Sequence, residues 1–126
     1  TIPSTVTEIG DYSFSGCSNL REVTFNGGLQ KIGVYAFYNC SSLESVTVPS
    51  TLVEIGNRAF HNCSTLREVE LNDGLQKIGY GAFCNCSSLQ SVTVPSTLVE
   101  ICDYVFDNCS NLREVKLNGV PHCLKS

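Results

Sequence analysis

Apolar positions recur every 23 residues along almost the whole chain. Three such columns each appear five times: the phenylalanines are Phe14, Phe37, Phe60, Phe83 and Phe106, the cysteines are Cys17, Cys40, Cys63, Cys86 and Cys109, and the leucines are Leu20, Leu43, Leu66, Leu89 and Leu112. A unit of this length cannot bury its apolar side alone, so neighbouring units must stack to form one continuous core. The period therefore predicts a solenoid of about five to six rungs, forming a single domain over residues 1–126.

Each repeat carries the signature of a short strand. Leu43, Val46 and Val48 form an L-x-x-V-x-V pattern whose last positions alternate between core and solvent, and Pro49 then ends the strand because it lacks an N–H. Leu52 and the isoleucine three residues later return to the core across a loop or a second short strand. The segment 57–62 predicts a helical turn on the outer side.

A column of glycine and asparagine follows each phenylalanine by two residues. Its members are Gly16, Asn39, Asn62, Asn85 and Asn108. Both residue types adopt a left-handed backbone conformation more readily than others, so this column is expected to end the helical turn.

Strands of successive repeats are expected to pair in parallel through right-handed connections. The predicted fold class is an α/β repeat, a right-handed solenoid with a parallel sheet of short strands and short helical turns on its outer side. Residues 120–126 depart from the repeat and form a non-repeat terminal segment. The chain begins in mid-repeat at Thr1, which predicts a fragment of a longer array with an uncapped first rung open to end-to-end contacts.

The amino-acid pattern of the repeat also resembles that of a known family. The pattern I-G-x-x-A-F-x-x-C-S-x-L-x-x-V-x-V-P, seen at 55–60 and from Cys63 onward, closely resembles the BspA-like leucine-rich repeats of bacterial and protist surface proteins, over residues 1 to about 119. The commonest leucine-rich repeats place Asn or Cys three residues after the last apolar strand position. Here that column is Gly28, Thr51, Gly74 and Thr97. The resemblance implies a non-catalytic scaffold that binds proteins or host surfaces, and it favours a cell-surface or secreted location.

A 46-residue period overlies the shorter one. GLQKIG begins at Gly28 and Gly74, whereas TLVEI begins at Thr51 and Thr97, so one column alternates in sign through Glu8, Lys31, Glu54, Lys77 and Glu100. Like charges in register on adjacent rungs would repel, so the alternation predicts a ladder of ion pairs. We expect this ladder to serve the stability of the fold. The alternative is that the charges also form a stripe that a partner recognises.

Composition and charge exclude several partner classes. Eight basic residues against twelve acidic ones give a net charge of −4, which opposes binding to nucleic acid. No apolar stretch approaches the ~18 residues needed to cross a bilayer, so direct membrane insertion is not expected. The 42% of apolar residues is ordinary for a globular domain.

The chain has eight cysteines, and five of them belong to the core column. Their Cβ vectors should be parallel, which suits packed thiols better than disulfides. Cys84, Cys102 and Cys123 lie outside that column; Cys102 could pair with Cys123, or all three could be free. Cys84-x-Cys86 lacks the usual spacing of a zinc site, and neither a metal nor a cofactor is expected.

Two further patterns have a chemical and a structural interpretation. His61, Cys84 and Asp107 share a column, as a cysteine nucleophile and its partners would, but a convex turn offers neither a cleft nor an oxyanion hole, so no catalytic residues are assigned. The four N-x-S sequons at Asn39, Asn62, Asn85 and Asn108 could carry glycans, although the turn already explains the asparagines.

The function expected from the sequence is a non-enzymatic protein-interaction or adhesion module. Its binding face would be the outer side of the strands, formed by Glu22, Thr24, Ser45, Thr47, Glu68, Glu70, Ser91, Thr93, Glu114 and Lys116. These shallow polar rows suit a protein epitope better than a small-molecule pocket. The alternative is a structural spacer or assembly subunit packed within a larger protein complex.

Overall fold

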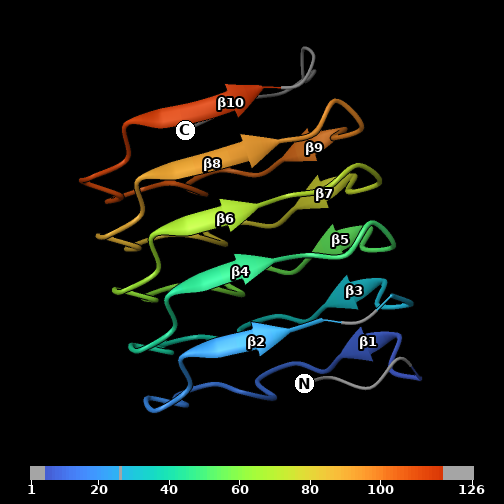
Figure 1. Cartoon of the computed structure of the whole chain (residues 1–126), viewed down its shortest axis with the longest axis horizontal. Helices are drawn as coiled ribbons and strands as arrows, with labels where there is room; N and C mark the ends of the chain where they lie inside the picture. The colour runs from blue at the N-terminus through green and yellow to red at the C-terminus, as the bar shows by residue number, and fades with distance from the viewer. Residues whose placement is uncertain (1–4, 26, 118–126) are drawn as a thin grey trace.

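The chain winds through five rungs, and each rung contributes one strand to each of two parallel sheets (Figure 1). The computed structural model describes residues 5–25 and 27–117. The front sheet contains β2 (Glu22–Thr24), β4 (Ser45–Thr47), β6 (Glu68–Glu70), β8 (Ser91–Val94) and β10 (Glu114–Leu117). The back sheet contains β1 (Glu8–Ile9), β3 (Lys31–Ile32), β5 (Glu54–Ile55), β7 (Lys77–Ile78) and β9 (Glu100–Ile101).

The 23-residue period sets the register of both sheets. Val46 pairs with Val69 in the front sheet, and Ile55 pairs with Ile78 in the back sheet. Each strand residue therefore lies directly above the residue 23 positions earlier in the sequence. The parallel solenoid predicted from the period is confirmed, and the region from Leu52 to Ile55 ends in a true second strand.

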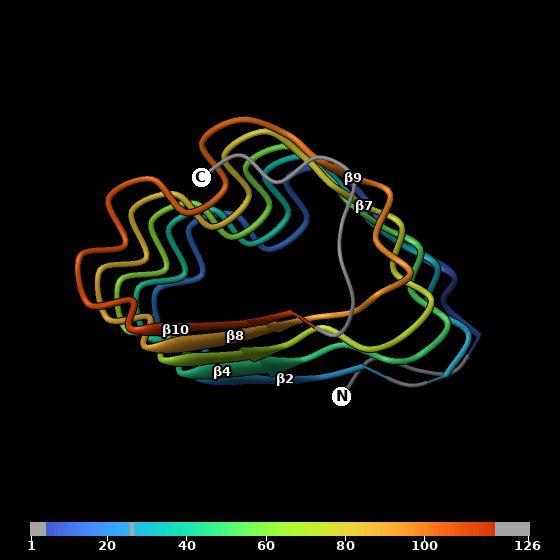
Figure 2. The same ribbon diagram turned by 90° about the horizontal axis from the view of Figure 1, so that it is seen from above.

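Viewed along the stack, the rungs nearly superimpose around a closed outline (Figure 2). The front sheet forms one side and the back sheet a second. The third side consists of the equivalent segments 10–17, 33–40, 56–63, 79–86 and 102–109, which we call the turn side.

The turn side is not helical, and the predicted helical turns are wrong. No helix occurs within residues 5–25 and 27–117. Along 58–63 the backbone N–H groups alternate: Phe60 donates to Ala82 of the next rung at 2.7 Å, whereas His61 donates within its own rung to Arg58 at 3.2 Å. A helix would keep all these bonds inside the segment. Here half of them join neighbouring rungs, so the backbone cannot continue as a helix.

The left-handed column was predicted correctly, although it ends a turn rather than a helix. Gly16 has φ 75°, and Asn39, Asn62, Asn85 and Asn108 have φ between 58° and 64°. Asparagine tolerates this region because its short polar side chain bonds locally. A second left-handed column, four residues earlier, was not predicted; its members Tyr12, Tyr35, Arg58, Gly81 and Tyr104 have φ between 55° and 63°.

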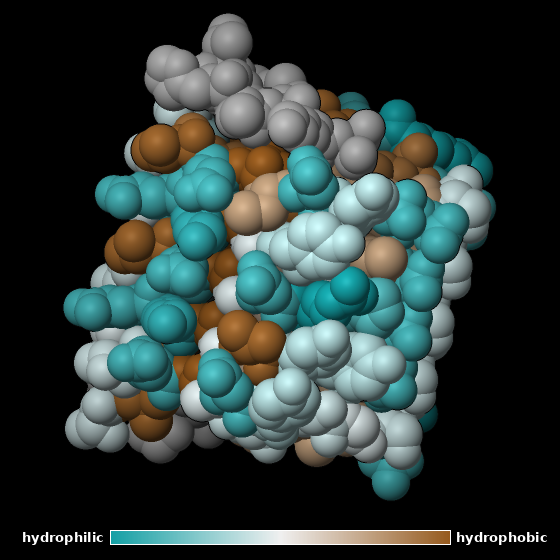
Figure 3. Space-filling model, turned by 180° about the vertical axis from the view of Figure 1, so that it is seen from behind, coloured by the Kyte–Doolittle hydropathy of each residue, from teal (hydrophilic) through white to brown (hydrophobic). Residues whose placement is uncertain are grey.

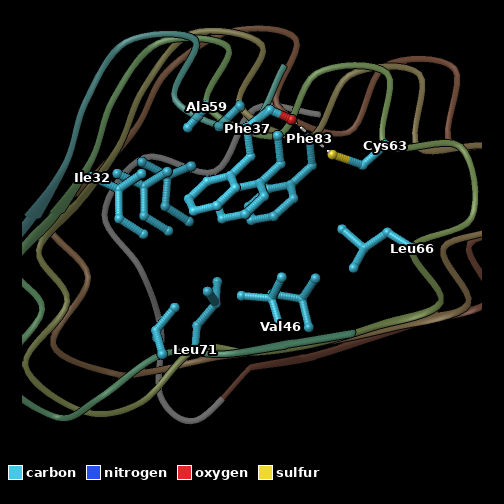
Figure 4. Close-up of a cluster of buried hydrophobic side chains, with 14 of the residues drawn as sticks. Ile32, Phe37, Val46, Ala59, Cys63, Leu66, Leu71 and Phe83 are labelled. Atoms are coloured by element: carbon cyan, nitrogen blue, oxygen red, sulfur yellow. Dashed lines mark hydrogen bonds between the residues drawn. The ribbon is translucent and has the colours of Figure 1, made fainter. Parts of the chain in front are cut away.

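Stacked phenylalanine rings run through the centre of the core (Figure 4). Phe37 and Phe60 lie 5.1 Å apart between centroids and are parallel within 2°, and Phe60 and Phe83 are 5.2 Å apart. The last pair widens to 6.0 Å between Phe83 and Phe106. The rings are fully buried in the three middle rungs and only partly buried at the ends.

A glycine column allows adjacent rungs to approach closely beside the back sheet. A Cβ on Gly56 would lie 2.7 Å from the carbonyl carbon of Gly33 and 2.8 Å from the nitrogen of Val34, which is closer than van der Waals contact permits. In the fifth rung this column holds Cys102 instead. The wider ring spacing at Phe106 occurs in the same rung.

Hydrogen bonds in the loops give the 46-residue period a physical basis. The Thr51 hydroxyl donates to the Leu29 carbonyl at 2.7 Å and accepts from the Gly28 N–H at 3.1 Å; Thr97 does the same for Leu75 and Gly74. The two glycines have φ near 109° and 108°, where a side chain would be strained. Threonine on one rung therefore caps the glycine loop of the rung before it.

The alternating charges lie as the sequence predicts but do not form the predicted ion pairs. Glu8 faces Lys31 and Glu54 faces Lys77 in register. Among the described residues, however, the only oppositely charged groups within 4.0 Å are Lys116 and Glu114. Alternation thus avoids like-charge contacts along the back sheet without making close salt bridges.

Several predictions concern residues that the structure does not describe. The segment 120–126, predicted to depart from the repeat, the thiol of Cys123 and residues 1–4, where an uncapped first rung was predicted, all lie outside the described ranges. Across 5–25 and 27–117, no helix has the length and apolarity needed to cross a membrane.

Replacing Phe60 by alanine tests the ring stack. We expect Phe60→Ala to lower the free energy of unfolding by about 3–5 kcal/mol in urea denaturation, because the rings above and below both lose a neighbour. The control Phe106→Ala should cost less, since its ring is partly buried and has one stacking partner in the described chain. Equal losses would show that the stack does not concentrate stability in the middle rungs.

The glycine column can be tested with a matched pair of substitutions. Gly56→Ala should destabilise the fold by about 1–3 kcal/mol, because the new methyl group would overlap the backbone of the preceding rung. Gly10→Ala occupies the same column in the first rung, where the nearest atom is the Ser13 hydroxyl oxygen at 3.2 Å, and should change stability by only about 0.5 kcal/mol. Thermal unfolding of both variants decides the matter.

Candidate interaction surface

The ten residues predicted to form a binding face all lie on the front sheet. Each strand points its central valine inward and its flanking residues outward: in β6, Val69 is buried while Glu68 and Glu70 are exposed. The register aligns these outward residues into two columns across the five rungs. Eight of the ten side chains are exposed, and Ser91 and Thr93 are half-buried. The structure thus brings the predicted residues together on one face, but it does not test whether they bind a partner.

The charges on this face are largely unpaired. Lys116 and Glu114 approach to 4.0 Å, but both side chains are about 60% exposed, so the contact adds little stability. Glu68 and Glu70 have no basic group of the described chain within 4.0 Å. Their carboxylates therefore remain available to groups outside the chain.

Shallow depressions follow the front sheet and its edges. One of about 320 Å³ is lined by Glu70, Leu71, Asn72, Asp73 and Thr93. A second depression, of about 240 Å³, lies over β2 and β4. A third, of about 200 Å³, lies where the chain enters β4 and β6. Their open shape and polar lining suit contact with another surface better than enclosure of a small ligand.

Two sets of residues extend this face beyond the strands: Asn72 and Asp73, which sequence reasoning missed, and Glu44 and Arg67, which belong to a second charged column with the same recognition-stripe alternative. Asn72 and Asp73 line the depression of about 320 Å³ just after β6, and Glu44 and Arg67 line the one of about 200 Å³ just before β4 and β6. Glu44 and Arg67 belong to a charged column that precedes each strand. The sequence shows that column, but only the structure places it beside the outward strand positions.

The cysteine column takes part in hydrogen bonds that the sequence did not reveal. Cys63 donates its S–H to the carbonyl of Phe37 at 3.2 Å, and the cysteines at 40, 86 and 109 repeat this contact with Phe14, Phe60 and Phe83 at 3.1–3.2 Å. Figure 4 shows the Cys63 thiol beside the ring stack. The seven cysteines of the described chain are free. A buried thiol here is both a small apolar group and a donor between rungs.

The environment of Cys84 opposes a nucleophilic role. Burial, together with the nearby Asp107 carboxylate, raises the pKa of the Cys84 thiol, whereas a reactive cysteine needs a lowered one. Partial burial and the nearby Arg58 lower the pKa of His61, whose Nδ1 atom has no hydrogen-bond partner and whose ring stacks on Tyr38. The three side chains share the turn side, away from the depressions on the front sheet.

Two other kinds of site were considered from the sequence, namely glycosylation sites and a metal site. The asparagines of the four sequons lie at or near the surface in left-handed turns, and glycosylation remains a prediction. Within the part of the chain that the structure describes, no three His, Cys, Asp or Glu side chains gather closely enough to hold a metal ion.

Comparison with known proteins identifies the family. The model of the BspA type leucine-rich repeat region matches residues 1–113 in six copies. The chain belongs to this family. Solenoids of this kind are generally non-enzymatic. A search of curated proteins finds no match.

Solved structures of bacterial proteins share the fold. A leucine-rich cell surface protein from Faecalibacterium prausnitzii is 27% identical with a TM-score of 0.87, over 94% of this chain and 31% of that one. A leucine-rich repeat protein from Bacteroides ovatus is 35% identical with a TM-score of 0.85, over 92% of this chain and 30% of that one. The pneumococcal vaccine antigen PcpA is 29% identical with a TM-score of 0.77, over 92% and 28%. The chain thus spans about a third of the length of such structures.

The buried thiols predict a loss of stability at alkaline pH. Burial raises the pKa of Cys40 and of Cys109 from 9.0 to about 11. A thiol that keeps its proton longer in the folded state stabilises the fold fully below pH 9, and this contribution is lost as pH rises towards 11, because the unfolded chain releases its protons first. We expect urea midpoints to fall between pH 9 and 11.

A double variant provides the control. Cys40→Ala with Cys109→Ala should show a shallower decline over the same interval, when both proteins are compared with their own values at pH 7. An unchanged slope would mean that other groups, such as the thiols of Cys63 and Cys86, whose pKa values burial also raises, cause the alkaline transition.

Proposed function

We propose that the chain is a non-catalytic interaction module whose front sheet binds a protein partner. The observation that carries this proposal is the alignment of ten polar, mostly exposed side chains on a sheet whose backbone is fixed by rung-to-rung pairing. The three depressions described above lie on or beside the same sheet. The cell-surface protein and the vaccine antigen among the similar structures are consistent with this role.

The rigidity of the sheet favours binding. The front-sheet strands are three or four residues long, and each inner strand pairs on both sides. The backbone beneath the face therefore loses little freedom on association, which lowers the entropic cost of binding. The threonine and serine side chains on this face are short, so they lose little conformational entropy when a partner binds.

The charge of the face indicates the character of the partner. The outward positions contain Glu22, Glu68, Glu70, Glu114 and Lys116, so acids outnumber bases by four to one. Glu68 and Glu70 are the two outward residues of the central strand, and no basic group within residues 5–25 and 27–117 lies within 4.0 Å of them. A partner with a basic patch opposite β6 would meet complementary charge, which raises association rate and specificity.

Charge reversal on the central strand tests the proposal. Glu68→Lys with Glu70→Lys should weaken binding to a partner isolated by cross-linking to the unchanged chain, by roughly tenfold or more, because like charges would then face each other. Affinity would be measured by biolayer interferometry with the purified partner.

The control carries the same change in net charge on the back sheet. Glu8→Lys with Glu100→Lys alters two exposed glutamates at the first and last back-sheet strands and should leave affinity within about twofold, as expected for charges far from a binding face. Because each new lysine would face Lys31 or Lys77 in register, the affinity is measured at a temperature where thermal unfolding shows this variant to be folded. Equal weakening by both double variants would show a general charge effect, and no weakening by the front-sheet variant would place the binding face elsewhere.

A further inference from the structure

The outward residues of the front sheet alternate in size and charge from one strand to the next. Strands β4 and β8 present only serine and threonine, whereas β2, β6 and β10 each present at least one charged side chain. We call the first set the hydroxyl strands and the second set the charged strands. Because neighbouring strands lie ~4.8 Å apart, this pattern repeats about every 10 Å along the stack.

The three depressions described above follow this alternation. Each is lined by a serine or threonine of a hydroxyl strand together with a glutamate of a neighbouring charged strand. Thr93 and Glu70 share the depression of about 320 Å³, and Ser45 and Glu68 share the one of about 200 Å³. The hydroxyl strands therefore lie lower than the rows of longer side chains beside them.

The column that precedes each front strand also changes sign in the middle of the sheet. Glu44 lies before β4 and Arg67 before β6, and both side chains are exposed and line the same depression. Within residues 5–25 and 27–117, neither of them forms an ion pair. Both charges are therefore available to groups outside the chain.

A second copy of the chain fits this face when it is turned over. A two-fold axis along the strand direction, placed between β4 and β6, keeps each column opposite itself and reverses the order of the rungs. Strand β4 of one copy then faces β6 of the other, and β2 faces β8. The two copies are thus offset by one rung, so that unlike strands meet.

In this arrangement each charged strand that is covered meets a hydroxyl strand. Glu68 lies opposite Ser45 of the second copy, whose hydroxyl group can donate a charge-assisted hydrogen bond to the carboxylate. Arg67 lies opposite Glu44 of the second copy at the centre of the interface, and the symmetry repeats this pair. No like charges of the facing columns meet. An axis through β6 would instead set Glu68 of one copy against Glu68 of the other.

The back sheet does not offer an equally good face for a second copy. Its strands are two residues long, and the one-rung offset that would pair Glu54 with a lysine would also set the exposed Val53 against Gln30. Seen from behind, the molecule carries mainly polar and pale side chains, with apolar ones in separate groups (Figure 3). No continuous apolar patch therefore widens the narrow back sheet, and the front sheet is the broader self-complementary face.

We propose that two copies of the chain pair face to face through their front sheets, offset by one rung, and thereby cover the face that binds the protein partner. The covering of a partner site rests on the function proposed above, whereas the pairing of the copies does not. A partner with a basic patch would displace the second copy, because it meets the carboxylates of Glu68 and Glu70 with opposite charge and not with neutral hydroxyl groups.

The size of the facing area makes this dimer weak. Four facing strands, each with about four residues, give a footprint of about 250 Å² at ~4.8 Å between strands and ~3.3 Å per residue. Stable interfaces bury about 800 Å² on each partner. The pairing is therefore transient and depends on a high concentration of the chain.

Swapping the central charges tests the pairing with the chain alone. Sedimentation equilibrium of the full chain in reducing buffer should show a monomer and dimer in equilibrium. Arg67→Glu would place a glutamate opposite Glu44 of the second copy, twice in each dimer, and should raise the dissociation constant by roughly tenfold or more. Glu44→Arg with Arg67→Glu restores opposite charges and should return that constant to within about threefold of its original value.

The matched control is Arg113→Glu. It makes the same change of charge in the same exposed column, but its strand, β10, faces no strand of the second copy. The dissociation constant should therefore stay within about twofold of that of the unchanged chain. Melting temperatures of the variants, taken at a concentration where the chain is monomeric, show whether each one is folded.

Four outcomes would overturn the proposal. The first is a chain that stays monomeric up to the highest soluble concentration. The second is equal weakening by Arg67→Glu and Arg113→Glu, which would show only general repulsion between acidic chains. The third is a double swap that fails to restore the dimer although it is folded. The fourth is an isolated partner that binds the intact dimer, since the front face would then not be covered.

The two proposals can fail separately. The front-sheet function is tested on an isolated partner with the reversal of Glu68 and Glu70, whereas the pairing is tested without a partner at Glu44 and Arg67. A chain that stays monomeric but loses its partner on reversal of Glu68 and Glu70 would retain the proposed function and exclude the dimer.

Discussion

Hydrogen bonds between consecutive rungs hold this protein together, and the other features depend on them. They join both sheets in register, and on the turn side every second backbone N–H, such as that of Phe60, donates to the next rung. Each bond contributes little by itself, but buried backbone groups must be paired, so every rung depends on its neighbours. Insertion of one residue would shift every column of the rung, which is why the 23-residue period is kept so strictly.

This constraint explains residues that look chemically interesting in the sequence. Gly56 is present because the preceding rung lies too close for a Cβ, and Cys63 because its thiol packs in the core while donating to the carbonyl of Phe37. Thr51 caps the loop of the rung before it. Such positions are fixed by stacking, so recognition is left to side chains that stacking does not need, such as the outward residues of the front sheet. The front sheet offers a flat, polar and mainly acidic face on a rigid backbone, which suits complementary charge on a broad epitope.

The sequence by itself determined the solenoid, the register, the inward and outward faces of the front strands and the left-handed asparagine column, because each depends on a strict period and on local residue preferences. It did not reveal the second sheet with certainty, and it wrongly predicted helical turns at segments such as 57–62. Only the tertiary structure decided where each backbone N–H is satisfied, since a short segment forms a helix or a rung-spanning turn according to the acceptors that its neighbour presents. For the same reason, the sequence does not show that the Cys63 thiol and the Thr51 hydroxyl donate hydrogen bonds to the rung before them. Nor does it show that the column of Tyr12 has a left-handed backbone.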